Sequence, residues 1–265
     1  MVSGIDKMIK LCDFTKCYSL KKTASPAVEK ISLCAGKGIT GILGLNGAGK
    51  TTIIKAILGE HYATSGKVLI SDEQGIFFDA AQSPEKARLA IGYVPENSLL
   101  PENLFVSEYL SLVQNVYSAH KSSIEKQRLF EKTVKEWGLS DALGKKIAVL
   151  SKGFKQRVSF AAAFMYDPAN IVLDEPVNGL DPAQIIQFRN SVREAGKTKT
   201  VVISTHLMQE VHSLCDAICI VVNGRSVFYG TEKELLDATK TECVEDAFLK
   251  ITSEVNAVEI KRQDG

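Results

Sequence analysis

The segment GLNGAGKTT, residues 44–52, joins an apolar run that ends at Leu43 to a second apolar run that begins at Ile53. It fits the pattern G-x-x-x-x-G-K-[ST] at Gly44, Gly49, Lys50 and Thr51. Such a segment curls between a strand and a helix, with backbone N–H groups turned inward and the positive end of the helix dipole aimed at the same point. Phosphate oxygens fit at that point, so the segment predicts a nucleoside triphosphate site on an α/β fold.

The residue types in this loop match that chemistry. Glycines carry no Cβ that would block the phosphates, Lys50 can reach the β- and γ-phosphates, and the Thr51 hydroxyl can ligate Mg²⁺. The alternative is a glycine-rich turn without a ligand, and the legible strand and helix on either side weigh against it. The loop residues expected to contact ATP are Asn46, Gly47, Ala48, Gly49, Lys50, Thr51 and Thr52.

Composition argues against several other classes of protein. With 265 residues, of which 45% are hydrophobic, the chain can bury a large core. Its net charge of +1 argues against nucleic acid, and against an anionic membrane surface, as the main partner. The apolar runs fall short of the roughly 20 residues that a transmembrane helix requires, so if a membrane is involved, another chain spans it.

The six cysteines indicate a reduced, cytosolic compartment, because they form no C-x-x-C pair and the chain start lacks the apolar core of a secretory signal. Cys215 and Cys219 could lie one helical turn apart, as metal ligands do. No His or carboxylate pattern surrounds them, so we expect buried, small apolar side chains and no metal–thiolate site.

Alternating and short apolar runs predict strands, and capping residues predict where helices begin. The expected strands are residues 8–15 and 28–34, paired antiparallel across the polar loop 19–26, then 68–71, 91–94, 171–173, 201–204, 218–222 and 226–229, the last two joined by a hairpin turn at Asn223 and Gly224. Helices are expected to begin at Pro84, Pro182 and Thr231, a charged helical pattern covers 107–137, and the polar tail 255–265 is expected to be loose.

A second chemical signal is IVLDEP, residues 171–176, an apolar strand that ends in two carboxylates. Beside a phosphate loop, the first acid, Asp174, can hold Mg²⁺ through its water shell. Glu175 can then orient a water near the γ-phosphate and accept its proton. Alone, an acidic pair after a strand is more often a cap or a solvated turn, but its place downstream of the phosphate loop favours a catalytic pair.

Taken together and in this order, the motifs resemble those of the nucleotide-binding subunits of ATP-binding cassette (ABC) transporters. Besides GLNGAGKTT and VLDEP, the chain carries LSKGFKQRV at residues 150–158, NGLDP at 178–182 and STH ending at His206. The resemblance implies that two subunits enclose two ATP molecules. It implies these roles: Ser151 and Gly153 reach the partner's γ-phosphate, His206 contacts the γ-phosphate, Asp181 links the two sites, and Tyr18 stacks on adenine.

Read one at a time, these residues have simpler explanations: a serine before a helix is usually a cap, and a lone histidine or tyrosine usually packs. The chain also departs from the family pattern. LSKGF stands for LSGGQ, and Glu96 of GYVPEN stands for a glutamine that contacts Mg²⁺ and the attacking water. Both departures, with DAFLKIT near the end, resemble exporter-type subunits that pair with a six-helix membrane subunit.

The implied architecture is a P-loop ATPase core with a small antiparallel sheet (1–94 and 166–230), a helical subdomain that carries the signature (95–165), and C-terminal helices with a tail (231–265). The implied function is hydrolysis of ATP, with Mg²⁺ as cofactor, that powers transport by a separate membrane subunit from its cytoplasmic face. The dimer could hold two copies of this chain or one beside a different cassette. The alternative function is that of a soluble cassette ATPase acting on another macromolecular complex; a neighbouring gene for a multi-span membrane protein would argue against it.

Overall fold

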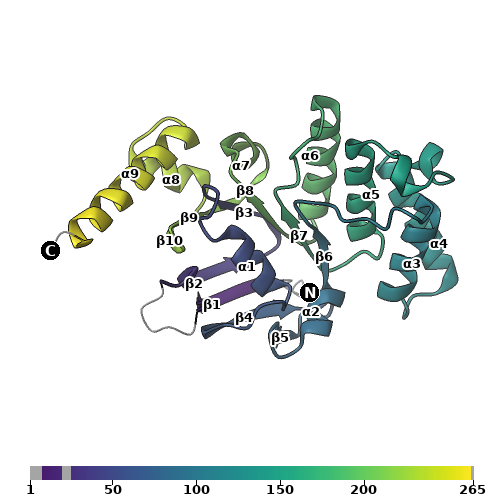
Figure 1. The fold of residues 1–265 in the computed structure, drawn as a ribbon, viewed down its shortest axis with the longest axis horizontal. Helices are drawn as coiled ribbons and strands as arrows, with labels where there is room; N and C mark the ends of the chain where they lie inside the picture. Colours follow the sequence, from purple (N-terminus) through teal and green to yellow (C-terminus); the bar gives the residue numbers. More distant parts are fainter. Residues whose placement is uncertain (1–7, 20–24, 264–265) are drawn as a thin grey trace, which may run out of the picture.

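The computed structural model describes residues 8–19 and 25–263 and has the expected α/β architecture (Figure 1). The strands are β1 (Ile9–Lys16), β2 (Val28–Ala35), β3 (Gly38–Leu43), β4 (Ser65–Ser71), β5 (Phe77–Asp79), β6 (Ile91–Val94), β7 (Asn170–Asp174), β8 (Thr200–Thr205), β9 (Ala217–Val222) and β10 (Arg225–Gly230). The α-helices are α1 (Lys50–Ile57), α2 (Pro84–Ala90), α3 (Val106–Tyr117), α4 (Ser123–Glu136), α5 (Lys152–Phe164), α6 (Pro182–Gly196), α7 (Met208–Leu214), α8 (Glu232–Thr239) and α9 (Val244–Gln263). The expected loop at 19–26 lies largely outside the described residues.

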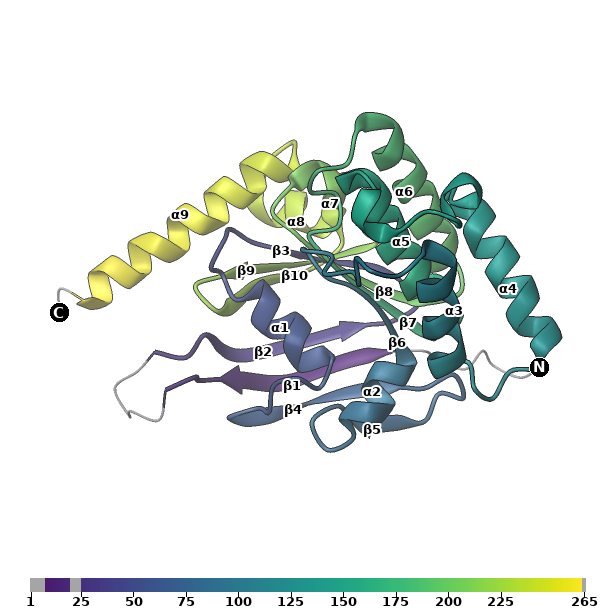
Figure 2. The same cartoon turned by 45° about the vertical axis from the view of Figure 1, so that its right-hand side comes forward.

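Two sheets form the layers of the fold. The larger has the order β10-β9-β3-β8-β7-β6, in which all strands but β10 run parallel. The smaller, β2-β1-β4-β5, is antiparallel throughout, which confirms the expected pairing of β1 with β2. Helix α1 lies between the two sheets (Figure 2).

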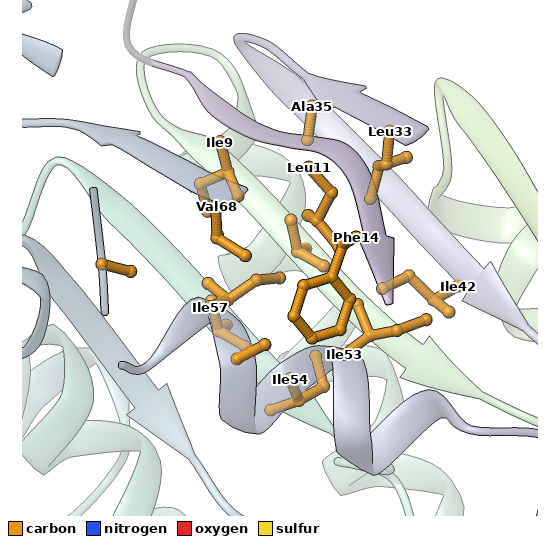
Figure 3. Close-up of a cluster of buried hydrophobic side chains, with 14 of the residues drawn as sticks. Ile9, Leu11, Phe14, Leu33, Ala35, Ile42, Ile53, Ile54, Ile57 and Val68 are labelled. Atoms are coloured by element: carbon orange, nitrogen blue, oxygen red, sulfur yellow. The ribbon is translucent and has the colours of Figure 1, made fainter. Parts of the chain in front are cut away.

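Apolar packing on α1 holds the two sheets together. Ile53, Ile54 and Ile57 of α1 are fully buried, and Phe14 of β1 lies against them (Figure 3). Burial of each such side chain contributes about 1.5–3 kcal/mol. The helix that begins at the phosphate loop is therefore fixed along its length, and the loop is fixed with it.

The central strands and the hairpin agree with the expectations from the sequence. Every residue of β7 and β8 is buried, as expected for parallel strands covered on both faces. Asn223 and Gly224 both have positive φ, 48° and 77°, which is the requirement of a type I′ hairpin turn. Thr231 and Glu234 form the expected capping box at α8.

The charged helical pattern at 107–137 forms two helices, α3 and α4, because Ser122 caps a new helix with Glu125 in a capping box. Together with α5 these helices gather beside β6 at one edge of the larger sheet (Figure 1). Trp137 stacks on Phe160 of α5 with ring centroids 4.8 Å apart, and Phe160 lies 5.1 Å from Phe188 of α6. This aromatic cluster joins the helical segment to the core.

The expectation of a loose tail from residue 255 is wrong, because α9 continues to Gln263 (Figure 2). Apolar residues at helical spacing explain the helix, since they pack on α7, α8 and β9: Val244, Ala247, Phe248, Ile251 and Val255. From Val244 to Asp264 the sequence contains no glycine or proline, so the helix continues beyond these packed residues.

Cys215 and Cys219 do not share a helix, because the first follows α7 and the second lies in β9. Burial raises the pKa of the Cys219 thiol to about 11, and it raises the pKa of Cys215 as well. Both therefore remain protonated thiols near neutral pH, as expected of packing groups. Across the described ranges, no helix has both the length and the apolarity needed to cross a bilayer.

Candidate functional site

The phosphate loop follows β3 and ends where α1 begins. Gly47 and Gly49 adopt φ of 81° and 107°, which L side chains rarely tolerate, and a Cβ on Gly49 would come within 2.9 Å of the Ala27 carbonyl oxygen. The Lys50 ammonium turns back into the loop and donates to the carbonyl oxygens of Gly44 (2.8 Å) and Leu45 (3.2 Å). The loop is thus shaped by its own backbone around a buried cation.

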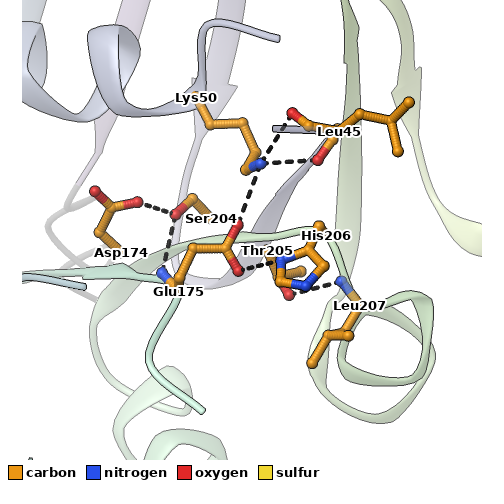
Figure 4. A network of polar contacts seen from close by, with 9 residues as sticks. Leu45, Lys50, Asp174, Glu175, Ser204, Thr205, His206 and Leu207 are labelled. Atoms are coloured by element: carbon orange, nitrogen blue, oxygen red, sulfur yellow. Dashed lines mark hydrogen bonds and ion pairs between the residues drawn. The ribbon is translucent and has the colours of Figure 1, made fainter. Parts of the chain in front are cut away.

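The two carboxylates predicted for the site lie at the end of β7. Asp174 pairs in parallel register with Ser204 of β8 and accepts a hydrogen bond from its hydroxyl. Glu175 follows with φ of 46°, and its N–H donates to the Ser204 carbonyl and hydroxyl oxygens at 3.1 and 3.2 Å. This backbone conformation turns the Glu175 side chain toward Lys50 (Figure 4).

Glu175 is held between two groups from different elements. Its Oε1 lies 3.1 Å from the Lys50 ammonium, and its Oε2 lies 2.8 Å from Nδ1 of His206, which follows β8 (Figure 4). The side chains of Lys50 and Glu175 are only 6% and 7% exposed, so the pair interacts through a poorly screened environment. The structure therefore brings Glu175, the expected base, together with Lys50 and His206, the two residues expected to contact the γ-phosphate.

A cavity of about 410 Å³ opens over this network. It is lined by Ala27, Asn46, Gly47, Gly49, Lys50, Thr51, Thr52, Glu96, Glu175, Asn178 and His206. Most of these were expected from the sequence; Ala27 and Asn178 were not, since Asn178 was read only as the start of NGLDP. Ala48 is buried beneath the loop, and its carbonyl accepts from the N–H of Gly224 in the β9–β10 hairpin.

The acidic side of this cavity suits a divalent cation. Burial raises the pKa of Asp174; the charges of Glu175 and Glu96 raise it further, against the opposing effects of the Ser204 hydrogen bond and of Lys50. No described group of three or more His, Cys, Asp or Glu side chains is close enough to cage a metal alone. Mg²⁺ needs no such cage, because it takes one or two protein oxygens and completes its shell with water and substrate phosphates.

Tyr18 lies beside the loop rather than in the lining of the cavity. Its hydroxyl is 3.2 Å from the Thr52 hydroxyl, its ring meets His61 edge-on at 5.3 Å, and the Lys16 ammonium lies 5.4 Å from the ring centroid. The side chain is 58% exposed. His61, which orients this ring, gave no signal in the sequence.

We define the signature surface as residues 150–158 and 178–182. Ser151 caps α5 by accepting from the N–H of Phe154 (3.3 Å), and Asp181 caps α6 by accepting from the N–H of Gln184 (2.9 Å). The starts of α5 and α6 lie side by side, because a Cβ on Gly153 would come within 2.7 Å of the Gln184 amide. Ser151 and Asp181 are exposed, and Ser151, Gly153 and Asp181 do not line the cavity.

The substituted signature residues have local partners. The Arg157 guanidinium stacks 3.9 Å above the Phe154 ring and donates to the carbonyl oxygens of Trp137 and Gly138 at 3.4 and 3.3 Å. Lys152 lies over the segment 178–182, since a Cβ on Gly179 would come within 2.8 Å of its ammonium. Phe154 therefore packs against its own helix, while Lys152 adds a positive charge to the signature surface.

One buried side chain of α5 was missed from the sequence. Gln156 accepts a hydrogen bond from the Ser98 hydroxyl (2.8 Å) and donates to the Pro176 carbonyl (3.3 Å). Ser98 lies two residues after Glu96, and Pro176 directly follows Glu175. Gln156 thus ties the signature helix to both loops that carry acids to the cavity.

Comparison with known proteins agrees with this geometry. A family model described as "ABC transporter" matches residues 28–178. The ABC-type transporter ATP-binding protein EcsA of Bacillus subtilis (strain 168) is 33% identical over 236 residues, which cover 88% of this chain and 93% of EcsA. A solved ATP-binding subunit of an ABC transporter matches with a TM-score of 0.84 and 29% identity, covering 92% of this chain and 99% of that one. CbiO1 from Clostridium perfringens, described as part of the ABC transporter complex cbiONQ, matches with a TM-score of 0.74 and 25% identity, over 88% and 91% of the two chains.

Proposed function

The chain belongs to the ABC transporter family as an ATP-binding subunit, and we propose that it hydrolyses ATP to power transport through a separate membrane subunit. The arrangement of Lys50, Glu175 and His206 in one cavity carries this proposal (Figure 4). A lysine, a carboxylate and an imidazole within ion-pair distance, beside a loop shaped for phosphates, supply the groups that phosphoryl transfer to water needs.

In the proposed mechanism, the phosphates displace the Lys50 ammonium from its present carbonyl and carboxylate partners and form ion pairs with it. Glu175 then orients a water and accepts its proton, while His206 holds the second carboxylate oxygen and contacts the γ-phosphate. Bound Mg²⁺, held through Thr51, Asp174 and Glu96, would offset the charge on the phosphates. Tyr18 stacks on adenine from the exposed rim.

We propose that ATP closes two subunits face to face. The signature surface supports this, because Ser151 and Gly153 stand at the start of α5 with helix N–H groups available to an anion, yet they lie outside the chain's own cavity. Asn178 lines that cavity, while Asp181 of the same segment is exposed. In a dimer, this segment could therefore couple the occupancy of one nucleotide site to the other.

We also propose where the membrane partner docks and in which direction transport runs. A hollow of about 200 Å³ between β6 and the helices α3 and α5, lined in part by Tyr93, Tyr109 and Val113, offers a place for a partner helix between the core (1–94 and 166–230) and the helical subdomain (95–165). Export is the direction we propose, from the LSKGF and Glu96 variants. The cytoplasmic face of a membrane would be the location of such a subunit.

Purification of the tagged chain from detergent-solubilised membranes, followed by ATPase assay, tests this function. We expect a multi-span membrane protein to co-purify, and ATP turnover to fall when Glu175 is changed to Gln. Release of the chain in the soluble fraction with a non-membrane complex would overturn the transport proposal and leave the ATPase proposal standing.

A further inference from the structure

Glu96 brings a carboxylate to the cavity from a third strand end. It lies two residues after β6, and β6 pairs in parallel with β7 so that Val94 is opposite Leu173. Glu96 and the acids at 174–175 therefore leave the same edge of the sheet, and Glu96 lines the cavity that Lys50 and Glu175 share.

The charges around the cavity do not balance for a polyanion. Among the described residues that line it there are two glutamates and one lysine, with the buried Asp174 directly behind. The lysine is already paired with Glu175 at 3.1 Å. Among the described residues of the lining, no further cation is set against the carboxylate of Glu96 when a triphosphate enters without a metal.

Groups nearby respond to the same negative field. Burial raises the pKa of Tyr93, and the charges of Asp174, Glu60 and Glu96 add to the effect. Glu96 also contributes to the raised pKa of Asp174. The carboxylate of Glu96 thus acts on Asp174 and on Tyr93, although its side chain is exposed and partly screened by water.

We propose that Glu96 makes nucleotide binding depend on a divalent cation, by repelling metal-free ATP and attracting the metal-bound form. This inference rests on the proposed ATP site and assigns Glu96 a role in selecting the species that enters it. A neutral amide at this position would keep the length of the side chain and one oxygen able to accept a hydrogen bond or ligate a metal, but it would remove the repulsion. An acid beside a bound cation is favourable, whereas the same acid beside bare phosphate is not.

Calorimetry with the non-hydrolysable analogue AMP-PNP tests the proposal, in excess Mg²⁺ and in EDTA, for the native chain, Glu96→Gln and the control Glu73→Gln. Glu73 is exposed on the β4–β5 turn and lines a different hollow, so its change alters net charge equally. In EDTA we expect Glu96→Gln to bind AMP-PNP about tenfold tighter than the native chain. In Mg²⁺ we expect no such gain, and Glu73→Gln should match the native chain in both.

A second readout uses the metal itself. Because coupling between two ligands is reciprocal, the AMP-PNP complex of the native chain should bind Mn²⁺, followed by its electron paramagnetic resonance signal, about tenfold tighter than the Glu96→Gln complex does. Equal losses of nucleotide affinity in EDTA for the native chain and Glu96→Gln would overturn the inference, as would the same gain in Glu73→Gln. If the native chain binds no AMP-PNP even in Mg²⁺, the proposed ATP site itself fails.

Discussion

The nucleotide cavity and the signature surface differ in how much of their geometry one chain supplies. In the cavity, the key groups come from the start of α1 and the ends of β7 and β8 and contact one another: Lys50 and His206 hold Glu175 at 3.1 and 2.8 Å. On the signature surface, Ser151 and Asp181 cap their helices and otherwise face solvent. The difference teaches that one chain by itself assembles the groups proposed for binding and chemistry, whereas the role proposed for the signature surface needs a facing subunit.

Glu175→Gln gives the largest effect expected. The amide keeps a polar contact to His206 but cannot accept a proton, so steady-state ATP turnover should fall by about 10²–10⁴-fold. Nucleotide affinity should be retained, and the variant should accumulate as a dimer in ATP by analytical ultracentrifugation. Undiminished turnover would mean that the cavity does not use Glu175 as base.

Lys50→Ala should act on binding. Loss of its charge-assisted contacts to the phosphates should weaken ATP affinity by on the order of 10- to 100-fold in calorimetry. Lys55→Ala, at the other end of α1 and away from the lining, is the matched control and should bind normally. An unchanged affinity for Lys50→Ala would contradict the assignment of the phosphate loop.

Ser151→Asp separates the two regions directly. Aspartate caps a helix as well as serine does, so thermal stability should change little, but its carboxylate should repel a phosphate presented by a facing subunit. We expect turnover to fall about tenfold or more while ATP binding by the monomer is unchanged. Ser83→Asp, at the start of α2, is the control. Loss of monomer binding in Ser151→Asp would show that the signature surface belongs to the chain's own cavity.

The sequence predicted residues that are placed by local chain geometry better than residues that act through distant contacts. Strand ends, glycine conformations and acidic pairs are local, so residues 44–52 and 174–175 could be placed before any contact was known. Gln156 and Ala27 could not, because their roles depend on contacts across distant elements. The fold was predictable where the periodicity of apolar residues is strong. The prediction was wrong at 255–263, because the polar composition there gave no sign that α9 continues.

The link between the two regions gives the smallest and most informative effect. Gln156 of α5 forms hydrogen bonds with Ser98 and Pro176. These two residues lie close to Glu96 and Glu175 in the sequence, and both glutamates line the cavity. Gln156→Leu keeps the volume but removes both hydrogen bonds, each worth about 0.5–1.5 kcal/mol. We expect turnover to fall about three- to tenfold with KM nearly unchanged, because the acids lose position rather than the loop losing affinity for ATP.

A matched control lies on another helix of the 95–165 region. Gln114 of α3 is equally buried, and its amide donates to the Lys126 carbonyl at 2.7 Å, away from both acidic loops. Gln114→Leu should lower the melting temperature to a similar extent and leave turnover per folded molecule intact. If both variants lose turnover alike, Gln156 only stabilises the fold. If only Gln156→Leu loses turnover, then the Gln156 amide couples the position of the signature surface, which moves in the proposed dimer closure, to the position of Glu175.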